Sequence, residues 1–459
     1  FNAPVFTSSG TLESGKAFAL SAGSITLSGR VASTQSITLA ATNGALDLGA
    51  ALQGTNIALS ALGGDLLIRN GKNIDATGLA SLSSNRTITV GGLVTGNAGV
   101  NINTTGGAIN FAANAGARSA NANVIISASG AVDNSGTFAA GGGVTVSGSS
   151  INSGAISANG AIALSASGTV NVNNIIDSST SATLASSAGA INVATLSGVL
   201  SGGRITLSAA TDITNAGDLS AETTLDATAA STLANSGFFF SRAGATRLGG
   251  AQLALGGNVY SATSLALNSN DISVSGSVGA NDAFGVTTNS LRILGGGLLQ
   301  SNNALTLTLG TAQIDGTLRA RSALDLTALS FGTGATGQVE AVGRLNAAVT
   351  GLLDNRGTIA VAGTAAALTL SAATLNNSNT LTATGDIAIS GGALNTSGMI
   401  KSGANLGITS SSTTVAAGAG LEASAALTLN SATANSAGNI AAGGAVSITG
   451  QNALDLGGA

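Results

Sequence analysis

The chain repeats one pattern of apolar and small polar residues at intervals of about twenty residues. Residues 132–170 contain its clearest copy. Eighteen residues separate the members of each matched pair there, namely Asn134 and Asn152, Gly136 and Gly154, Phe138 and Ile156, Val144 and Ile162, and Val146 and Leu164. A fixed period of this length is the sequence signature of a solenoid, in which successive turns stack on one another.

Within each copy, apolar residues alternate with small polar ones, as in Val144-x-Val146 and Ile162-x-Leu164. Alternation with a period of two is typical of a β-strand that has one buried face. The period of 3.6 that would indicate an amphipathic helix is absent from these copies. The sequence therefore predicts an all-β chain.

Three apolar sites recur together in each repeat near the N-terminus. The first site is Val31, Leu52, Ile74 and Val94; the second is Ile37-x-Leu39, Ile57-x-Leu59 and Val100-x-Ile102; the third is Leu46-x-Leu48, Leu66-x-Ile68, Ile88-x-Val90 and Ile109-x-Phe111. Three short strands per turn follow. Because the turns between them are too short for hairpins, each strand is expected to pair with its equivalent one turn further on, which gives a parallel β-helix.

The first site continues through most of the chain, with one step of 44 residues, from Val94 to Phe138, that we interpret as two turns. It includes Leu200, Leu298, Leu381, Ile400 and Leu421. We therefore expect residues 1–459 to form a single repeat shaft of about twenty-two turns. Because the pattern stops abruptly at LDLGGA, we expect the chain to be a piece of a longer protein. Irregular loops are predicted near 112–123, 242–252, 281–290 and 328–350.

Asparagine and glycine recur together before the first strand of the repeat. Gly permits positive φ in a turn, and stacked Asn side chains can hydrogen-bond from one turn to the next. We therefore predict a structural turn ladder at Asn134, Asn152, Asn215, Asn235 and Asn355.

Composition excludes several classes of function. Only 7% of the residues are charged and the net charge is -4, so nucleic acid and anionic membranes are poor partners. Cys and His are both absent, which removes disulfides and the commonest metal ligands and general bases. No stretch approaches the length of apolar sequence needed for membrane insertion. We expect no cofactor, no bound metal and no catalytic residues.

Three segments match a known repeat class: SINSGAISANGAIALSAS, DITNAGDLSAETTLDATAAS and GALNTSGMIKSGANLGITS. Their unit, L-x-N-x-G-x-[IL]-x-A-x-G-x-[IL]-x-L, resembles the repeats of filamentous haemagglutinin-like exoproteins of Gram-negative two-partner secretion, which contact-dependent inhibition toxins share. The match is good over about 125–236 and 350–450. It implies a right-handed β-helical shaft, exported through an outer-membrane secretion barrel and either secreted or displayed on the cell surface. The family's secretion domain, C-terminal toxin and maturation region have no visible counterpart in this chain.

Parallel β-helices also occur in enzymes, ice-binding proteins and autotransporter passenger domains. β-Helical enzymes that act on polysaccharides cluster Asp, Arg or Lys on one face, whereas Asp47, Asp65, Asp75 and Asp133 are spread singly over many turns. Ice-binding β-helices need unbroken ranks of Thr, and the ranks here are interrupted by Ala. An autotransporter-like passenger domain remains the main alternative to the adhesin shaft, and the flanking sequence would separate the two.

The repeat also predicts which side chains point outward together. Glu222 and Arg242 should lie one turn apart, as should Arg319 and Glu340, and each pair could form an ion pair. An outward aromatic cluster is expected at Phe238, Phe240 and Tyr260, flanked by Arg242, with Phe239 in the core between the two Phe residues. This candidate contact patch would suit a host-cell receptor, a glycan or a neighbouring fibre. Alternatively, a loop at 242–252 folds over the rings and makes a small satellite core.

Overall fold

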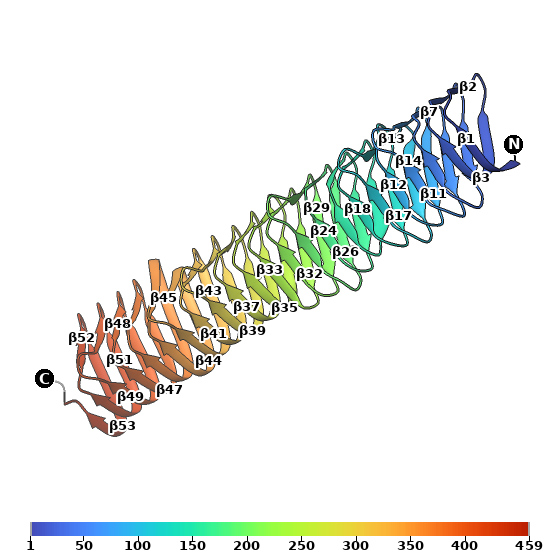
Figure 1. Cartoon of the computed structure of the whole chain (residues 1–459). Helices are drawn as coiled ribbons and strands as arrows, with labels where there is room; N and C mark the ends of the chain where they lie inside the picture. Colours follow the sequence, from blue (N-terminus) through green and yellow to red (C-terminus); the bar gives the residue numbers. More distant parts are fainter. Residues whose placement is uncertain (1, 458–459) are drawn as a thin grey trace. The chain divides into compact units, whose positions relative to one another are not determined.

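The computed structural model describes residues 2–457, and every regular element in that range is a β-strand (Figure 1). The strands pair in parallel with their equivalents one turn earlier and one turn later. Leu381 lies beside Ile400, and Ile400 beside Leu421, as the repeat predicts. The fold is a right-handed parallel β-helix of about 23 turns, which confirms the predicted fold class.

The chain divides into two compact units, Phe1–Thr232 and Leu233–Ala459, each of which is a stack of turns. The expectation of one shaft over residues 1–459 stays a prediction. In each unit the apolar side chains of the strands point inward and form a column, which includes Phe138 in the first unit and Phe239 and Phe284 in the second.

In the first unit most turns have three separate strands, one on each face. The first face contains β2 (Leu12–Ser14), β4 (Val31–Ser33), β7 (Leu52–Gly54), β10 (Ile74–Ala76), β13 (Leu93–Gly96), β16 (Gly116–Ser119), β19 (Thr137–Ala140), β22 (Ala155–Ala158), β25 (Ile175–Ser178), β28 (Gly198–Ser201) and β31 (Asp218–Ala221). The second face contains β5 (Ile37–Ala41), β8 (Ile57–Ala61), β11 (Leu79–Ser84), β14 (Gly99–Thr104), β17 (Val124–Ala128), β20 (Val144–Gly148), β23 (Ile162–Ala166), β26 (Ser181–Ser186), β29 (Arg204–Ala209) and β32 (Leu225–Ala229).

The third face of this unit contains β6 (Leu46–Leu48), β9 (Leu66–Ile68), β12 (Ile88–Val90), β15 (Ile109–Phe111), β18 (Val132–Asn134), β21 (Ile151–Ser153), β24 (Val170–Val172), β27 (Ile191–Val193) and β30 (Ile213–Asn215). Near the N-terminus, β3 (Phe18–Leu27) runs across both the second and the third face, and β1 (Asn2–Ser8) pairs with it. The boundary between the units falls within β33 (Thr232–Asn235).

The second unit fuses the second and third strands of most turns into one strand that bends at a corner. Its short first-face strands are β34 (Phe238–Ser241), β36 (Asn258–Ser261), β38 (Ser277–Ala280), β40 (Leu298–Ser301), β42 (Thr317–Ala320), β46 (Thr380–Ala383), β48 (Met399–Ser402), β50 (Gly420–Ala423) and β52 (Asn439–Ala442). The fused strands are β35 (Thr246–Leu255), β37 (Leu265–Val274), β39 (Phe284–Ile293), β41 (Leu305–Ile314), β43 (Ala323–Thr333), β47 (Ile387–Thr396), β49 (Leu406–Val415), β51 (Leu427–Ser436) and β53 (Val446–Asp455). The first-face strand joins them as well in β44 (Gln338–Asn355) and β45 (Thr358–Asn377).

This fusion corrects the prediction of loops near 242–252, 281–290 and 328–350, because strands occupy most of each of these ranges, whereas 112–123 in the first unit contains only the short strand β16. At the bend of β39 the alternation of buried and exposed residues skips one position and resumes at Leu291, so the apolar spacing looks irregular although pairing continues. In 242–252 a buried Thr246 takes an apolar position. In 112–123, β16 supplies Ala117, the inward residue that links Val94 to Phe138 and confirms two turns there.

Two first-site residues were predicted one position away from the inward residue, Leu200 one position too late and Leu298 one position too early. Ile176 pairs with Val199 and not with Leu200, and Val278 pairs with Leu299 and not with Leu298. In both places two adjacent apolar residues compete for one inward position, and spacing alone does not choose between them. The structure buries Val199 and Leu299 fully and leaves Leu200 37% exposed.

Candidate functional site

The predicted contact patch lies on the first face of the second unit. In β34 the central Phe239 is fully buried, while Phe238 and Phe240 on either side of it are half-buried and point outward. Phe240 pairs in register with Tyr260 of β36, one turn further on. The alternation of inward and outward side chains, counted from Gly237, therefore predicted the orientations of Phe238, Phe239 and Phe240 correctly.

The three outward rings of the patch stack on one another. The ring centroids of Phe238 and Phe240 are 5.7 Å apart with 21° between the planes, and those of Phe240 and Tyr260 are 5.9 Å apart with 12°. The row ends at Gly279, which follows Tyr260 in register and has no side chain to continue the stack. Two of the chain's ten Phe and its one Tyr thus form one continuous outward surface.

Most of the loop predicted at 242–252 as a cover for these rings is a strand instead. Residues Thr246–Leu255 form β35, which pairs with β37 and follows the wall of the helix instead of folding across the first face. Arg242 is exposed in the turn after β34. The half-buried rings are consistent with a contact surface, and that role stays a prediction.

The predicted turn ladder divides into two sets of asparagines. Asn134, Asn215, Asn235 and Asn355 are buried at the end of a third-face strand. Asn152 instead pairs with Asp133 and points outward, because the turn after β21 is one residue shorter than the turn after β18. The match of Asn134 with Asn152 by eighteen residues is therefore wrong as a spatial pairing.

Asn152 belongs to an outward ladder that the sequence did not reveal. Its side-chain amide donates to the carboxylate of Asp133, Asn171 donates to Asn152 over 2.7 Å, and Asn192 donates to Asn171 over 2.9 Å. Each link joins adjacent turns on the third face. The residues could have been grouped from sequence by counting from Val132, Ile151, Val170 and Ile191, the apolar residues that precede them.

The buried asparagines differ in whether their side-chain amide groups have hydrogen-bond partners. Asn355 donates to Asn377 over 2.7 Å and accepts a hydrogen bond from Thr333 over the same distance, and Asn377 donates to Thr396 over 3.1 Å. Asn134 accepts a hydrogen bond from the backbone of Gly136, but its buried amide nitrogen has no partner. The ladder at Asn355 is therefore a continuous stabilising feature of the second unit.

Ion pairs also connect adjacent turns. Arg319 and Glu340 face each other in register, with Nε and Oε2 2.6 Å apart, which confirms one of the two predicted pairs. Glu222 and Arg242 belong to different units, and their pair stays a prediction. Arg69, in the turn after β9, donates two hydrogen bonds to Asp47 of the preceding turn, and these raise the pKa of the Arg69 guanidinium.

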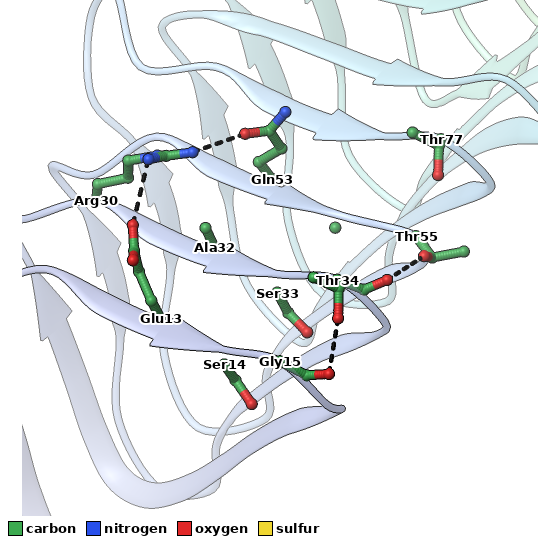
Figure 2. A pocket seen from close by; sticks show the side chains of 11 residues that line it. Glu13, Ser14, Gly15, Arg30, Ala32, Ser33, Thr34, Gln53, Thr55 and Thr77 are labelled. Carbon is green, nitrogen blue, oxygen red and sulfur yellow. Dashed lines mark hydrogen bonds and ion pairs between the residues drawn. The ribbon is translucent and has the colours of Figure 1, made fainter.

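Sequence reasoning missed a polar groove on the first face of the first unit (Figure 2). It consists of two hollows of about 600 and 350 Å³ that share Gln53 and Thr77. Arg30 lies along one side of the larger hollow, where it bonds Glu13 and Gln53, and Ala32 lies between these two residues. The shape of the groove depends on the lengths of side chains that are about twenty residues apart in the sequence. Only the pairing register of the strands shows that these side chains are neighbours.

Within residues 2–457 no three Asp or Glu side chains approach closely enough to hold a metal ion. The same range contains no helix that is long and apolar enough to span a membrane.

Comparison with protein-family models, with characterised proteins and with solved structures gave no match to this chain. The resemblance to filamentous haemagglutinin-like repeats therefore rests on the quoted repeat residues alone.

Proposed function

We propose that this chain is a structural shaft of a large secreted or cell-surface fibrous adhesin of the filamentous haemagglutinin type. The observation that carries the proposal is the regular parallel stacking in both units, in which each strand pairs only with its equivalents in neighbouring turns. A β-solenoid of this kind is compatible with a fibrous shaft, because turns can be added without changing the contacts of the others.

The charged groups support a structural role over a catalytic one. The ion pairs Arg69–Asp47, Arg319–Glu340 and Lys401–Glu422 each join two adjacent turns and are partly exposed. Such pairs stabilise a ladder by small amounts, and in each of them the carboxylate is already engaged by a cation. In this proposal a region outside the chain directs export through an outer-membrane barrel of a Gram-negative bacterium, and the shaft projects a binding or toxic tip.

Location and export test this proposal. Antibodies raised against residues 1–459 should label intact cells of the producing bacterium, or detect the protein in its culture medium, without permeabilisation. Loss of the partner secretion barrel should abolish that signal and leave a cytoplasmic control protein unaffected. Labelling that requires lysis of the cells would contradict the proposal.

The aromatic contact patch is where this shaft would meet a host-cell receptor, a glycan or a neighbouring fibre. Stacked, half-buried rings next to an Arg are the residue types that anchor interfaces. A variant with Phe238→Ser and Phe240→Ser, compared with the unchanged chain in a cell-binding assay, measures the contribution of the patch separately from export.

A further inference from the structure

The polar groove is long and narrow. Its outward residues follow one register line, Glu13, Ala32, Gln53, Asp75, Thr95 and Arg118, on six successive strands of the first face. With adjacent strands about 4.8 Å apart, this line extends over about 24 Å. The two hollows each have the volume of a small-molecule site, at about 600 and 350 Å³. A groove of this shape suits a linear polymer that lies across successive turns.

Two walls and a low floor define the larger hollow (Figure 2). The floor is lowest at Ala32, whose side chain is short. On one side the Arg30 guanidinium donates to Glu13 over 3.3 Å and to Gln53 over 2.9 Å. On the other side lie Thr34, Thr55 and Thr77, one from each of three successive turns of the helix. Because these hydrogen bonds already fix the Arg30 side chain, a ligand that contacts it would not pay the entropy cost of ordering that side chain.

The groove has hydrogen-bonding capacity that the protein does not use. Gln53 accepts from Arg30 through Oε1, and its amide nitrogen donates to no residue within 2–457. The hydroxyls of Thr34 and Thr55 donate to backbone oxygens over 2.8 and 3.1 Å, so their lone pairs remain available as acceptors. Asp75 accepts the Thr95 hydroxyl on Oδ1 and keeps Oδ2 available. One donor and several acceptors match sugar hydroxyls, because each hydroxyl can both donate and accept.

The charges in the groove cancel. Glu13 and Asp75 contribute two carboxylates, and Arg30 and Arg118 contribute two guanidinium groups. A polyanion such as a nucleic acid needs an excess of cationic side chains, and this groove has none. The balance favours an uncharged polymer.

A peptide fits less well than a glycan. Extended peptides usually bind by adding a strand to a free sheet edge, and β4, β7 and β10 are already paired on both sides. The groove also has no apolar recess for peptide side chains, since its lining is mostly Ser, Thr, Gln and charged residues. We propose that the polar groove binds an extended, uncharged glycan chain, with Gln53, Thr34, Thr55 and Asp75 hydrogen-bonded to its hydroxyl groups.

The test uses the whole chain and a panel of neutral polysaccharides, namely soluble glucans, mannans, galactans and xylans, in affinity electrophoresis. At least one should retard the protein. Ala32→Trp, which fills the floor, should weaken that affinity by at least about tenfold, and Gln53→Ala by a smaller factor. Ala360→Trp is the matched control, because Ala360 is also half-buried and outward on the first face, but in the second unit. Binding should change little with added salt, because no net charge is involved.

Three results would overturn this assignment: no retardation by any neutral polysaccharide, retardation by acidic polysaccharides alone, or unchanged affinity in a folded Ala32→Trp variant. If Ala32→Trp lowers the melting temperature strongly, Gln53→Ala combined with Thr55→Val decides in its place, since both changes are at the surface. The outcome is independent of where the protein is located in the cell, so it can fail while the shaft proposal holds.

Discussion

Leu196 occupies a left-handed turn position that is glycine in three other turns. Its φ is 63°, the only positive value at a non-glycine residue within 2–457, and its side chain is 94% exposed. The turn is closed by a hydrogen bond from Ser197 to Ala194, three residues apart. Turns closed in the same way place Gly71, Gly296 and Gly418 at this position, each with positive φ. A left-handed backbone favours Gly because a Cβ crowds the following carbonyl oxygen.

We therefore expect Leu196→Gly to stabilise the protein. Relief of the left-handed conformation should exceed the added chain entropy of Gly by about 0.5–1 kcal/mol in the free energy of unfolding. Leu196→Ala is the control, because it removes the exposed side chain but keeps the Cβ. Chemical denaturation of both variants measures the difference. Equal effects of Gly and Ala would show that backbone strain is not the cause.

At the scale of a strand, the buried ladder at Asn355, Asn377 and Thr396 makes a testable contribution. Asn377 is 1% exposed and donates to Thr396 while accepting from Asn355. Asn377→Ala should lower the free energy of unfolding by about 1–3 kcal/mol, because it leaves buried polar groups without partners.

Asn376→Ala is the matched control for that change. Asn376 is the preceding residue of β45, points outward and accepts one exposed hydrogen bond from Asn395. Its loss should cost less than about 0.5 kcal/mol, as is usual for surface substitutions. Denaturant titration of both variants compares the two losses. A similar cost for both would mean that the inner ladder is no more important than the outer one.

Strand spacing was predictable where apolar residues fill the inward positions, as at Ile37-x-Leu39 and Leu46-x-Leu48, all fully buried. It was not predictable where strands bend, as in β35 and β39, since a skipped residue at a corner changes the phase of alternation. The ladder assignment at Asn152 failed for a related reason. Turn length sets which residues are stacked, and it varies independently of the strand pattern.

For the whole molecule, nearest-neighbour stacking predicts that one complete turn can be removed. Deletion of residues 380–398 would place Met399 where Thr380 lies and restore pairing of Ile359 with Ile400, because Thr380 and Met399 are equivalent in register. The deleted protein should unfold cooperatively, with a melting temperature lowered by less than about 5 °C. Circular dichroism during heating gives both quantities.

A half-turn deletion is the control for this experiment. Removing only residues 380–388 deletes the first-face strand β46 and joins the turn after β45 directly to Ile389 of the fused β47, which shifts every later inward residue out of register. That variant should lose the cooperative transition. If both deletions unfold alike, stability does not come from register-matched stacking of neighbouring turns.

The sequence by itself determined the fold class and the inward face of most strands. This was possible because the alternation within a strand and the repeat of about twenty residues are both visible in the order of the residues, without knowledge of tertiary contacts. The same counting oriented Phe238, Phe239 and Phe240 correctly, since their alternation is fixed by one strand.

Only the tertiary structure decided which outward side chains meet. Glu13, Arg30 and Gln53 form one wall of the groove because turns of different lengths bring them into adjacent rows, and Ala32 leaves space between them because it is short. The outward ladder from Asp133 to Asn192 arises in the same way. The repeat specifies that turns stack, whereas the length of each turn and the size of each outward side chain specify what the stacked surface can bind.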